Sequence, residues 1–245
     1  MPRSLLPREH GAYAQLAAPL AGAFATFGAS LAGALIALGA CLAFVANEPL
    51  LVVLGHRGKR AKADDGRRAK RMLAILAPAA AITGLAGLAL APATIAVAAI
   101  VAAPACILVV LAWKRQERTL AGEVVAAVAL SGAAAPVAVA AGASLHHAMW
   151  VWAAWAIGYG FTVVAVHRVI ERHRKAATVV DLIAVVVAIA SACVLAFASM
   201  VIALPLVTCS IVLLLVAPSA KHLRAIGFVL VGASLFSITL GAMFA

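Results

Sequence analysis

The sequence predicts an all-α integral membrane protein with about nine transmembrane helices. Of its 245 residues, 66% are hydrophobic and 11% are charged, and the mean hydropathy is +1.13. A soluble domain is about half apolar and about one quarter charged, so this composition is typical of a membrane protein. Apolar runs of spanning length recur along the chain, and short basic clusters separate them.

One long basic segment and tight turns delimit the first four predicted spans. A bilayer core needs roughly 20 apolar residues per helix, within a range of about 17 to 25. The segment GHRGKRAKADDGRRAKR at 55–71 is predicted to be a basic cytoplasmic loop between spans two and three. An Ala-Pro-Ala turn at 91–93 separates spans three and four. These spans are predicted at about 11–28, 31–54, 72–90 and 94–112.

Short polar or proline-containing segments delimit the other five spans. KRQER at 114–118 precedes span five, and a polar turn near 143–147 follows it. ERHRK at 171–175 follows span six, Pro205 breaks span seven from span eight, and KHLR at 221–224 precedes span nine. These spans are predicted at about 121–142, 148–170, 179–199, 203–217 and 226–244, within one domain of residues 1–245.

The placement of charge predicts the orientation. With nine spans, all 19 Lys and Arg residues fall on one side of the membrane, in or within a turn of 1–10, 55–71, 114–118, 171–178 and 219–224. Lys and Arg resist translocation, so we expect a multi-pass protein of the cell (inner) membrane with a cytoplasmic N-terminus and an outer C-terminus. All eight acidic residues lie on the same side, which indicates a polar cavity open to the cytoplasm.

The net charge of +11 indicates contact with lipid rather than with nucleic acid. The basic residues lie in short clusters between apolar runs, so no soluble surface exists for a duplex. A juxtamembrane basic fringe facing anionic headgroups explains the charge, and it makes the bilayer the expected partner. The residues of 55–71 are interpreted as solvated and lipid-facing, with a specific site as the alternative. The four cysteines lie inside apolar runs without CxxC spacing and are predicted to be packing residues.

Asn47-Glu48-Pro49 forms the first group of candidate functional residues. It lies about two turns before the basic segment, near the cytoplasmic end of span two. Charge inside a span is costly, and Glu48 is too short to reach far toward water. Two interpretations remain open. Glu48 is either a helix-end carboxylate paired with a loop arginine or a carboxylate that binds a ligand or metal.

The sequence VHRVIERHR at the end of span six forms the second group. His167 and Glu171 are four residues apart and share a helix face, as do Arg168 and Arg172. A ladder of helix-end salt bridges is one interpretation, because such pairs are common and weak. His167 lies deeper in the span, and a functional role is the alternative.

Polar residues at two other span entries complete the set. In KRQERTLAGE, Lys114 and Arg118 fit the positive-inside rule, whereas Glu123 lies about a turn into span five and is placed to hold Arg118 or a ligand. In PREHG, Arg8 and His10 stand at the start of span one. Interfacial anchoring and participation in a site are both open for these two residues.

Five blocks of the chain resemble the YwiC-like family of bacterial membrane proteins. They are PREHGAYAQLAAP, NEPL, QERTLAGE, VHRVIERHR and KHLRAIG, and they occur in this order over nearly the whole sequence. The family has no established biochemical role, so the resemblance implies a membrane protein without implying an activity.

The chain is also distantly similar to the UbiA superfamily of intramembrane prenyltransferases. This similarity implies nine helices around a cytoplasm-facing cavity, with the N-terminus inside and the C-terminus outside. Asn47-Glu48 stands where the first acidic motif of these enzymes begins, and His167 with Glu171 stands where the second falls. Leu51 replaces an acidic position of the first motif, and the second has one carboxylate. A Mg²⁺ ion that bridges a diphosphate prefers several hard oxygen ligands, and for such an ion the two motif positions offer Asn47, Glu48 and Glu171.

The working hypothesis is a protein that binds an isoprenoid or lipid phosphate in a cytoplasm-facing cavity and, if active, transfers a prenyl group. The alternative is a non-enzymatic transporter or a lipid-binding assembly factor. The hypothesis assigns catalysis to Glu48, Glu123, His167 and Glu171, phosphate binding to Arg8, His10, Lys114, Arg118, Arg168 and Arg172, and any metal to Asn47, Glu48 and Glu171.

Overall fold

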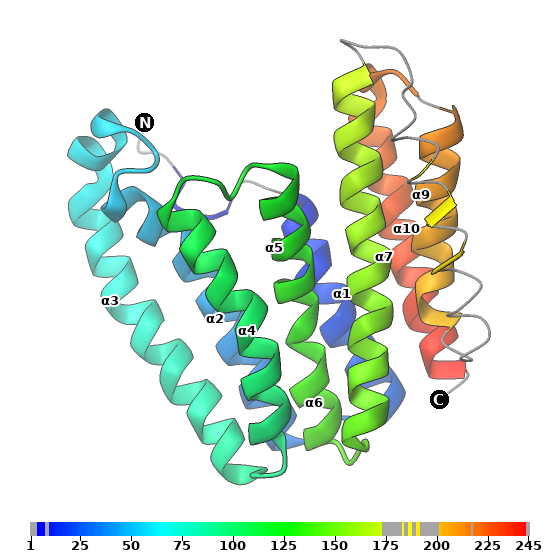
Figure 1. Cartoon of the computed structure of the whole chain (residues 1–245). Helices are drawn as coiled ribbons and strands as arrows, with labels where there is room; N and C mark the ends of the chain where they lie inside the picture. The colour runs from blue at the N-terminus through cyan, green and yellow to red at the C-terminus, as the bar shows by residue number, and fades with distance from the viewer. Residues whose placement is uncertain are drawn as a thin grey trace.

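The computed structural model describes residues 4–7, 10–172, 183, 186–187, 190–191, 201–216 and 218–243. All the regular secondary structure of these residues is helical (Figure 1). The helices are α1 (His10–Phe27), α2 (Leu31–Leu54), α3 (Lys59–Leu90), α4 (Thr94–Trp113), α5 (Leu120–Gly132), α6 (Ala134–Ala140), α7 (Leu145–Arg172), α9 (Leu204–Val216) and α10 (Leu223–Met243), with short 3-10 turns at Val201–Ala203 and Ala220–His222.

Six helical segments within the described residues are long and apolar enough to cross a membrane. They are α2, α3, α4, α5 together with α6, α7, and α10. The chain therefore has the character of a multi-pass membrane protein, as the composition predicts. Helix α1 has 18 residues and α9 has 13, and both coincide with predicted spans. The predicted span at 179–199 lies outside the continuously described residues, so the total of nine stays a prediction.

The basic segment 55–71 differs from its prediction, because most of it is helix rather than loop. Only four residues, Gly55 to Gly58, connect α2 to α3, and both glycines have the positive φ angles, 81° and 97°, that such a tight turn requires. Lys59 then begins a continuous helix of 32 residues. The segment is rich in Ala, Lys and Arg, which favour helix, and its charge alone does not break one.

The buried positions of this basic half of α3 show why it stays attached to the bundle. Ala61, Asp65 and Ala69 are buried at a spacing of four residues, so they form one helix face. Ala69 packs in a small apolar cluster with Leu5 and Val52. The remaining charged residues point away from this face and are exposed.

Charged side chains gather at one end of the bundle, which we call the basic end. Helices α2, α4 and α7 end there, and α3, α5 and α10 begin there (Figure 1). Helix α1 also begins toward the basic end, whereas α10 ends at the opposite one (Figure 1). This arrangement accords with the sequence-based charge pattern, and the cytoplasmic position of the basic end stays a prediction from the positive-inside rule.

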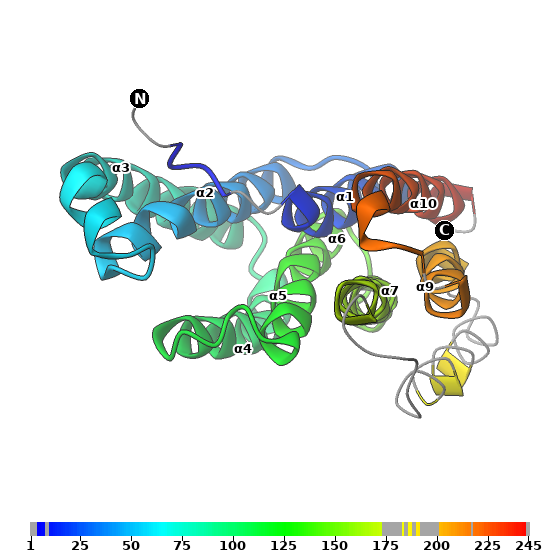
Figure 2. The ribbon, with the colours of Figure 1, turned by 90° about the horizontal axis from the view of Figure 1, so that it is seen from above.

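Close helix contacts through small residues hold the bundle together. A Cβ atom added to Gly87 of α3 would lie 2.8 Å from the carbonyl oxygen of Ala32 in α2, and one added to Gly39 would lie 2.9 Å from the Gly84 nitrogen. Small residues permit such an approach where lipid supplies no hydrophobic driving force. Viewed from above, α2 and α3 form one side, α1, α5 and α6 the centre, and α7, α9 and α10 the other side (Figure 2).

Candidate functional site

Glu48 forms a buried, bidentate ion pair near the end of α2. The residue is 3% exposed, and its carboxylate accepts two hydrogen bonds from Arg57, of which the one from Nε to Oε1 measures 2.8 Å. The second runs from Nη2 to Oε2. Gly55 ends the helix in the left-handed conformation and turns the chain so that Arg57 returns toward Glu48. The structure thus shows the pairing of a helix-end carboxylate with a loop arginine.

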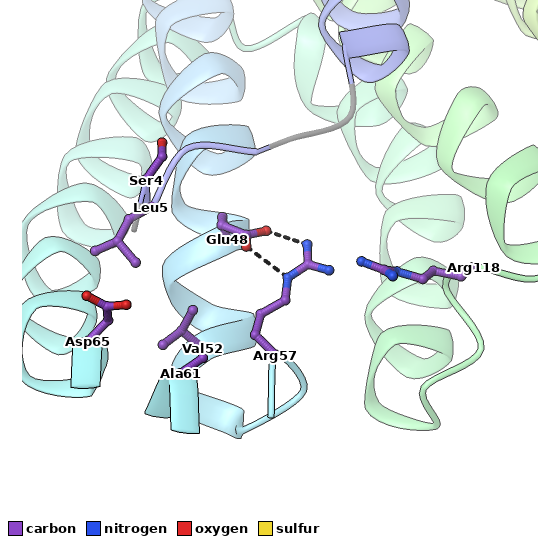
Figure 3. Close-up of a pocket in the computed structure, with 8 residues that line it drawn as sticks. All are labelled: Ser4, Leu5, Glu48, Val52, Arg57, Ala61, Asp65 and Arg118. Atoms are coloured by element: carbon purple, nitrogen blue, oxygen red, sulfur yellow. Dashed lines mark hydrogen bonds and ion pairs between the residues drawn. The ribbon is translucent and has the colours of Figure 1, made fainter. Parts of the chain in front are cut away.

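A hollow of about 120 Å³ opens beside this pair, and we call it the Glu48 hollow. Asp65, only 7% exposed, and Arg118 are its other charged residues (Figure 3). Leu5 of the N-terminal segment is buried against it. The complete lining is Ser4, Leu5, Glu48, Val52, Arg57, Ala61, Asp65 and Arg118.

The connection between α4 and α5 positions Arg118 beside the hollow. The Oγ1 atom of Thr119 accepts a hydrogen bond of 3.1 Å from the Gly122 nitrogen and so caps α5. Gly122 has no side chain at the place where a Cβ atom would clash with the carbonyl oxygen of Gln116, so the connection folds closely over the first turn. Arg118 is therefore held at the start of α5 while its side chain stays exposed.

The charged side chains of the Glu48 hollow follow one another from one side of the hollow to the other. Arg57 neutralises Glu48 directly. Figure 3 shows Arg118 on one side of this pair, with its guanidinium extending toward it, and Asp65 on the other side. The hollow therefore presents the Arg118 guanidinium at one end and the Asp65 carboxylate at the other, with the Glu48–Arg57 ion pair between them (Figure 3).

A second group of charges, which we call the His167 cluster, joins α5 to α7. His167 Nδ1 lies 3.7 Å from Glu123 Oε2, and its Nε2 lies 3.4 Å from Glu171 Oε1. Arg168 donates a hydrogen bond of 3.1 Å to Glu171. The two carboxylates therefore face opposite edges of one imidazole ring. Both carboxylate side chains are about half exposed.

The structure places two of the remaining candidates, Asn47 and Lys114, outside these two groups. Asn47 is exposed and is not part of the hollow's lining, although it precedes Glu48 in sequence. Lys114 is also exposed and outside that lining. Arg8 lies outside the described residues, and the side chains of His10 and Arg172 are likewise not described.

The described residues do not suit a resident Mg²⁺ ion. Both carboxylate oxygens of Glu48 accept hydrogen bonds from Arg57, and Asn47 does not line the hollow. Glu171 belongs to the His167 cluster. No group of three or more His, Cys, Asp or Glu residues in the described part of the chain is placed to hold a metal. Mg²⁺ prefers several oxygen ligands in near-octahedral geometry, and this set does not supply them.

Sequence reasoning offered a loop arginine as the partner of Glu48 without identifying it as Arg57, and it missed Asp65, because it treated 55–71 as a solvated loop. The spacing of Ala61, Asp65 and Ala69 carried the relevant signal. A carboxylate that replaces a small residue within a small-residue stripe indicates a charge turned toward the protein. The sequence signal for Arg57 was weaker. Arg57 lies two residues after Gly55, and a glycine there can reverse the chain and return the arginine toward Glu48.

The model of the family described as YwiC-like protein matches residues 6–139, which is more than half of the chain. The chain belongs to the YwiC-like family. The matched segment contains all four charged residues of the Glu48 hollow, whereas His167 and Glu171 follow it. No curated protein and no solved structure matches this YwiC-like chain.

Proposed function

We propose that this YwiC-like protein binds the phosphate group of an isoprenoid or phospholipid in the Glu48 hollow. The observation that carries the proposal is the bidentate pair in which Glu48 holds the guanidinium of Arg57 beside Arg118. A guanidinium whose orientation is fixed by one partner loses less freedom when it binds a second. Arginine is also the side chain best suited to bidentate contact with phosphate oxygens.

The size and place of the hollow favour a headgroup over a whole lipid. Its volume of about 120 Å³ is well below the roughly 300–1,000 Å³ of pockets that enclose drug-sized ligands. Most of its lining residues come from the end of α2, the start of α3 and the residues just before α5, which all lie at the basic end. A phosphate would therefore enter the hollow while its apolar tail stays along the outer faces of the helices.

The described residues that could ligate a metal favour phosphate binding over catalytic turnover. In prenyl transfer, the bond between C1 and the oxygen of a prenyl diphosphate breaks, diphosphate leaves with the electron pair, and an acceptor bonds to C1 and gives up a proton. Glu123 or His167 would be the candidate for taking that proton. The absence of a suitable Mg²⁺ ligand set among the described residues removes the usual stabilisation of the leaving group.

The binding proposal is tested with a charged ligand and its uncharged counterpart. In phosphatidylcholine nanodiscs, we expect the protein to bind geranylgeranyl phosphate and to bind geranylgeraniol at least tenfold more weakly. Arg118→Gln should weaken phosphate binding about tenfold, since a hydrogen bond to a charged group contributes about 1.5–3 kcal/mol. Lys114→Gln is the matched control, from the same connection but outside the hollow. Equal affinity for the phosphate in both variants would refute the assignment.

Turnover is tested separately. If the protein is a prenyltransferase, it should release diphosphate from labelled geranylgeranyl diphosphate in the presence of an acceptor. Glu48→Ala and Glu171→Ala should both abolish that release. Full activity in the double variant would exclude the catalytic roles of these carboxylates, and binding without release would support a lipid-binding protein.

The His167 cluster favours a proton-coupled transporter as the second candidate. A histidine with carboxylates at both ring edges can take a proton at one nitrogen and give one up at the other. In proteoliposomes with an entrapped pH-sensitive dye, proton flux that stops in His167→Gln would support this function. Flux unchanged by that substitution would rule out a role for the cluster.

A further inference from the structure

The basic half of α3 borders a second hollow on a different face, and we call it the Lys62 groove. Its volume is about 240 Å³. Val53 near the end of α2 contributes one wall, and four residues of α3 contribute the rest. Three of those four are basic, and none of the lining residues is acidic. The lining is Val53, Lys62, Gly66, Arg67 and Lys70.

Helix periodicity explains the shape of the groove. Lys62, Gly66 and Lys70 follow at intervals of four residues and so share one face, over about 12 Å at 1.5 Å per residue. Gly66 leaves the space between the two lysines open. A Cβ atom built on Gly66 would meet only the Lys62 side chain, at 3.9 Å.

The groove gathers three positive charges, and no acidic side chain in its lining balances them. Within the described residues, none of its three basic side chains forms an ion pair with an acidic one. Asp65, the neighbour of Gly66, is buried and lines the Glu48 hollow instead. Like charges at adjacent helix positions repel one another, so an anion placed among them would relieve that repulsion.

The surroundings of the groove point to a lipid as the source of this anion. The apolar, spanning part of α3 begins directly after the basic half, and Ile75 and Ile82 on it are exposed. Lys70 therefore stands next to the level at which lipid headgroups meet the helix. Basic residues at this level attract anionic lipids.

We propose that the Lys62 groove is a second phosphate site, which binds the phosphomonoester headgroup of an anionic membrane lipid. The Lys62, Arg67 and Lys70 side chains hold the phosphate oxygens, and the acyl chains lie along the exposed apolar face of α3. The site is independent of the Glu48 hollow, because the two linings share no residue.

The experiment titrates the full-length protein, in phosphatidylcholine nanodiscs, with short-chain phosphatidic acid. The test variant carries Lys62→Gln, Arg67→Gln and Lys70→Gln. The matched control carries Lys59→Gln, Arg60→Gln and Arg71→Gln, which remove the same charge from the same helix outside the groove. We expect at least a tenfold loss of affinity in the test variant and less than a threefold loss in the control. Equal losses in the two variants would show diffuse surface attraction and overturn the proposal.

A steric variant provides evidence that does not depend on net charge. Gly66→Leu fills the floor of the groove and favours helix, so it should lower the affinity for phosphatidic acid about tenfold with the fold intact. Unchanged affinity in Gly66→Leu would contradict the site.

Two further measurements are needed. One distinguishes a lipid from a free phosphate as the ligand, and the other distinguishes the Lys62 groove from the Glu48 hollow. Inorganic pyrophosphate that binds as tightly as phosphatidic acid would overturn the lipid assignment in favour of a free phosphate. The phosphatidic acid titrations are repeated in the Arg118→Gln background, in which phosphate binding at the Glu48 hollow is weakened, and the loss caused by the groove substitutions should persist there. Failure of the groove proposal is thereby distinguishable from failure of the proposed function.

Discussion

The two charged groups at the basic end contain similar residue types but differ in burial and geometry. The side chains of Glu48 and Arg57 are 4% and 19% exposed, and their Nε–Oε1 distance is 2.8 Å. In the His167 cluster, Glu171 is 51% exposed, and the histidine lies 3.4 Å and 3.7 Å from its carboxylates. The first pair belongs to one helical hairpin, whereas the cluster bridges α5 and α7. The comparison teaches that burial and contact distance, more than the number of charges, distinguish the two groups.

The largest effect is expected from Glu48→Gln, which would remove the carboxylate from the buried bidentate pair with Arg57. Removing one member of a buried pair costs about 3–5 kcal/mol, and the partial exposure of Arg57 places the expected loss near the lower end, about 3 kcal/mol. Thermal unfolding in detergent micelles measures it. Asn47→Ala is the matched control, since Asn47 is adjacent but exposed. Equal unfolding temperatures for the two variants would contradict the contrast drawn here.

A smaller effect tests the close packing of α2 against α3, the helical hairpin that carries the first pair. Gly87→Ala would bring a methyl group to 2.7 Å from Ile36 and should destabilise the protein by about 1–3 kcal/mol. Gly84→Ala, where a Cβ atom meets nothing within 4 Å, is the control and should be close to neutral. Comparable losses in both variants would show that the contact adjusts freely.

The smallest effect is expected in the His167 cluster. Glu171→Gln removes carboxylate contacts with His167 and Arg168, but exposed ion pairs contribute about 0–1 kcal/mol each. We therefore expect an unfolding free energy within about 1 kcal/mol of the parent protein. The same micelle assay measures it, and a loss as large as that of Glu48→Gln would erase the difference between the two groups.

Hydropathy and turn signals predicted most helix boundaries well. The predicted span 31–54 coincides with α2, and 94–112 is one residue shorter than α4. The predicted span 121–142 is divided into α5 and α6, because Pro136 has no N–H to bond the carbonyl of Gly132. Length and composition determine where a chain enters lipid, so these features are readable from sequence alone.

The site was less predictable, because its parts are joined by tertiary contacts. Sequence reasoning selected Glu48 and Arg118, which line one hollow, and it also selected Glu123 and His167, which contact each other. It expected one cavity for all four, whereas the structure places them in two groups. The number of charged residues in a segment does not say which helix face each of them occupies. The basic half of α3 shows this, because Asp65 could be placed on the buried face only after the segment was recognised as a helix.

The unbroken course of α3 has a mechanical consequence. Its 32 residues extend about 48 Å at 1.5 Å per residue, well beyond the roughly 30 Å thickness of a hydrocarbon core. The excess is the basic half of the helix, whose Ala69 packs against Val52 near the end of α2. A tilt of this basic half would reach α2 through the Ala69 contact and through the close approach of Gly87, whereas Pro78, which lacks a backbone N–H, is the position between them where α3 bends most easily.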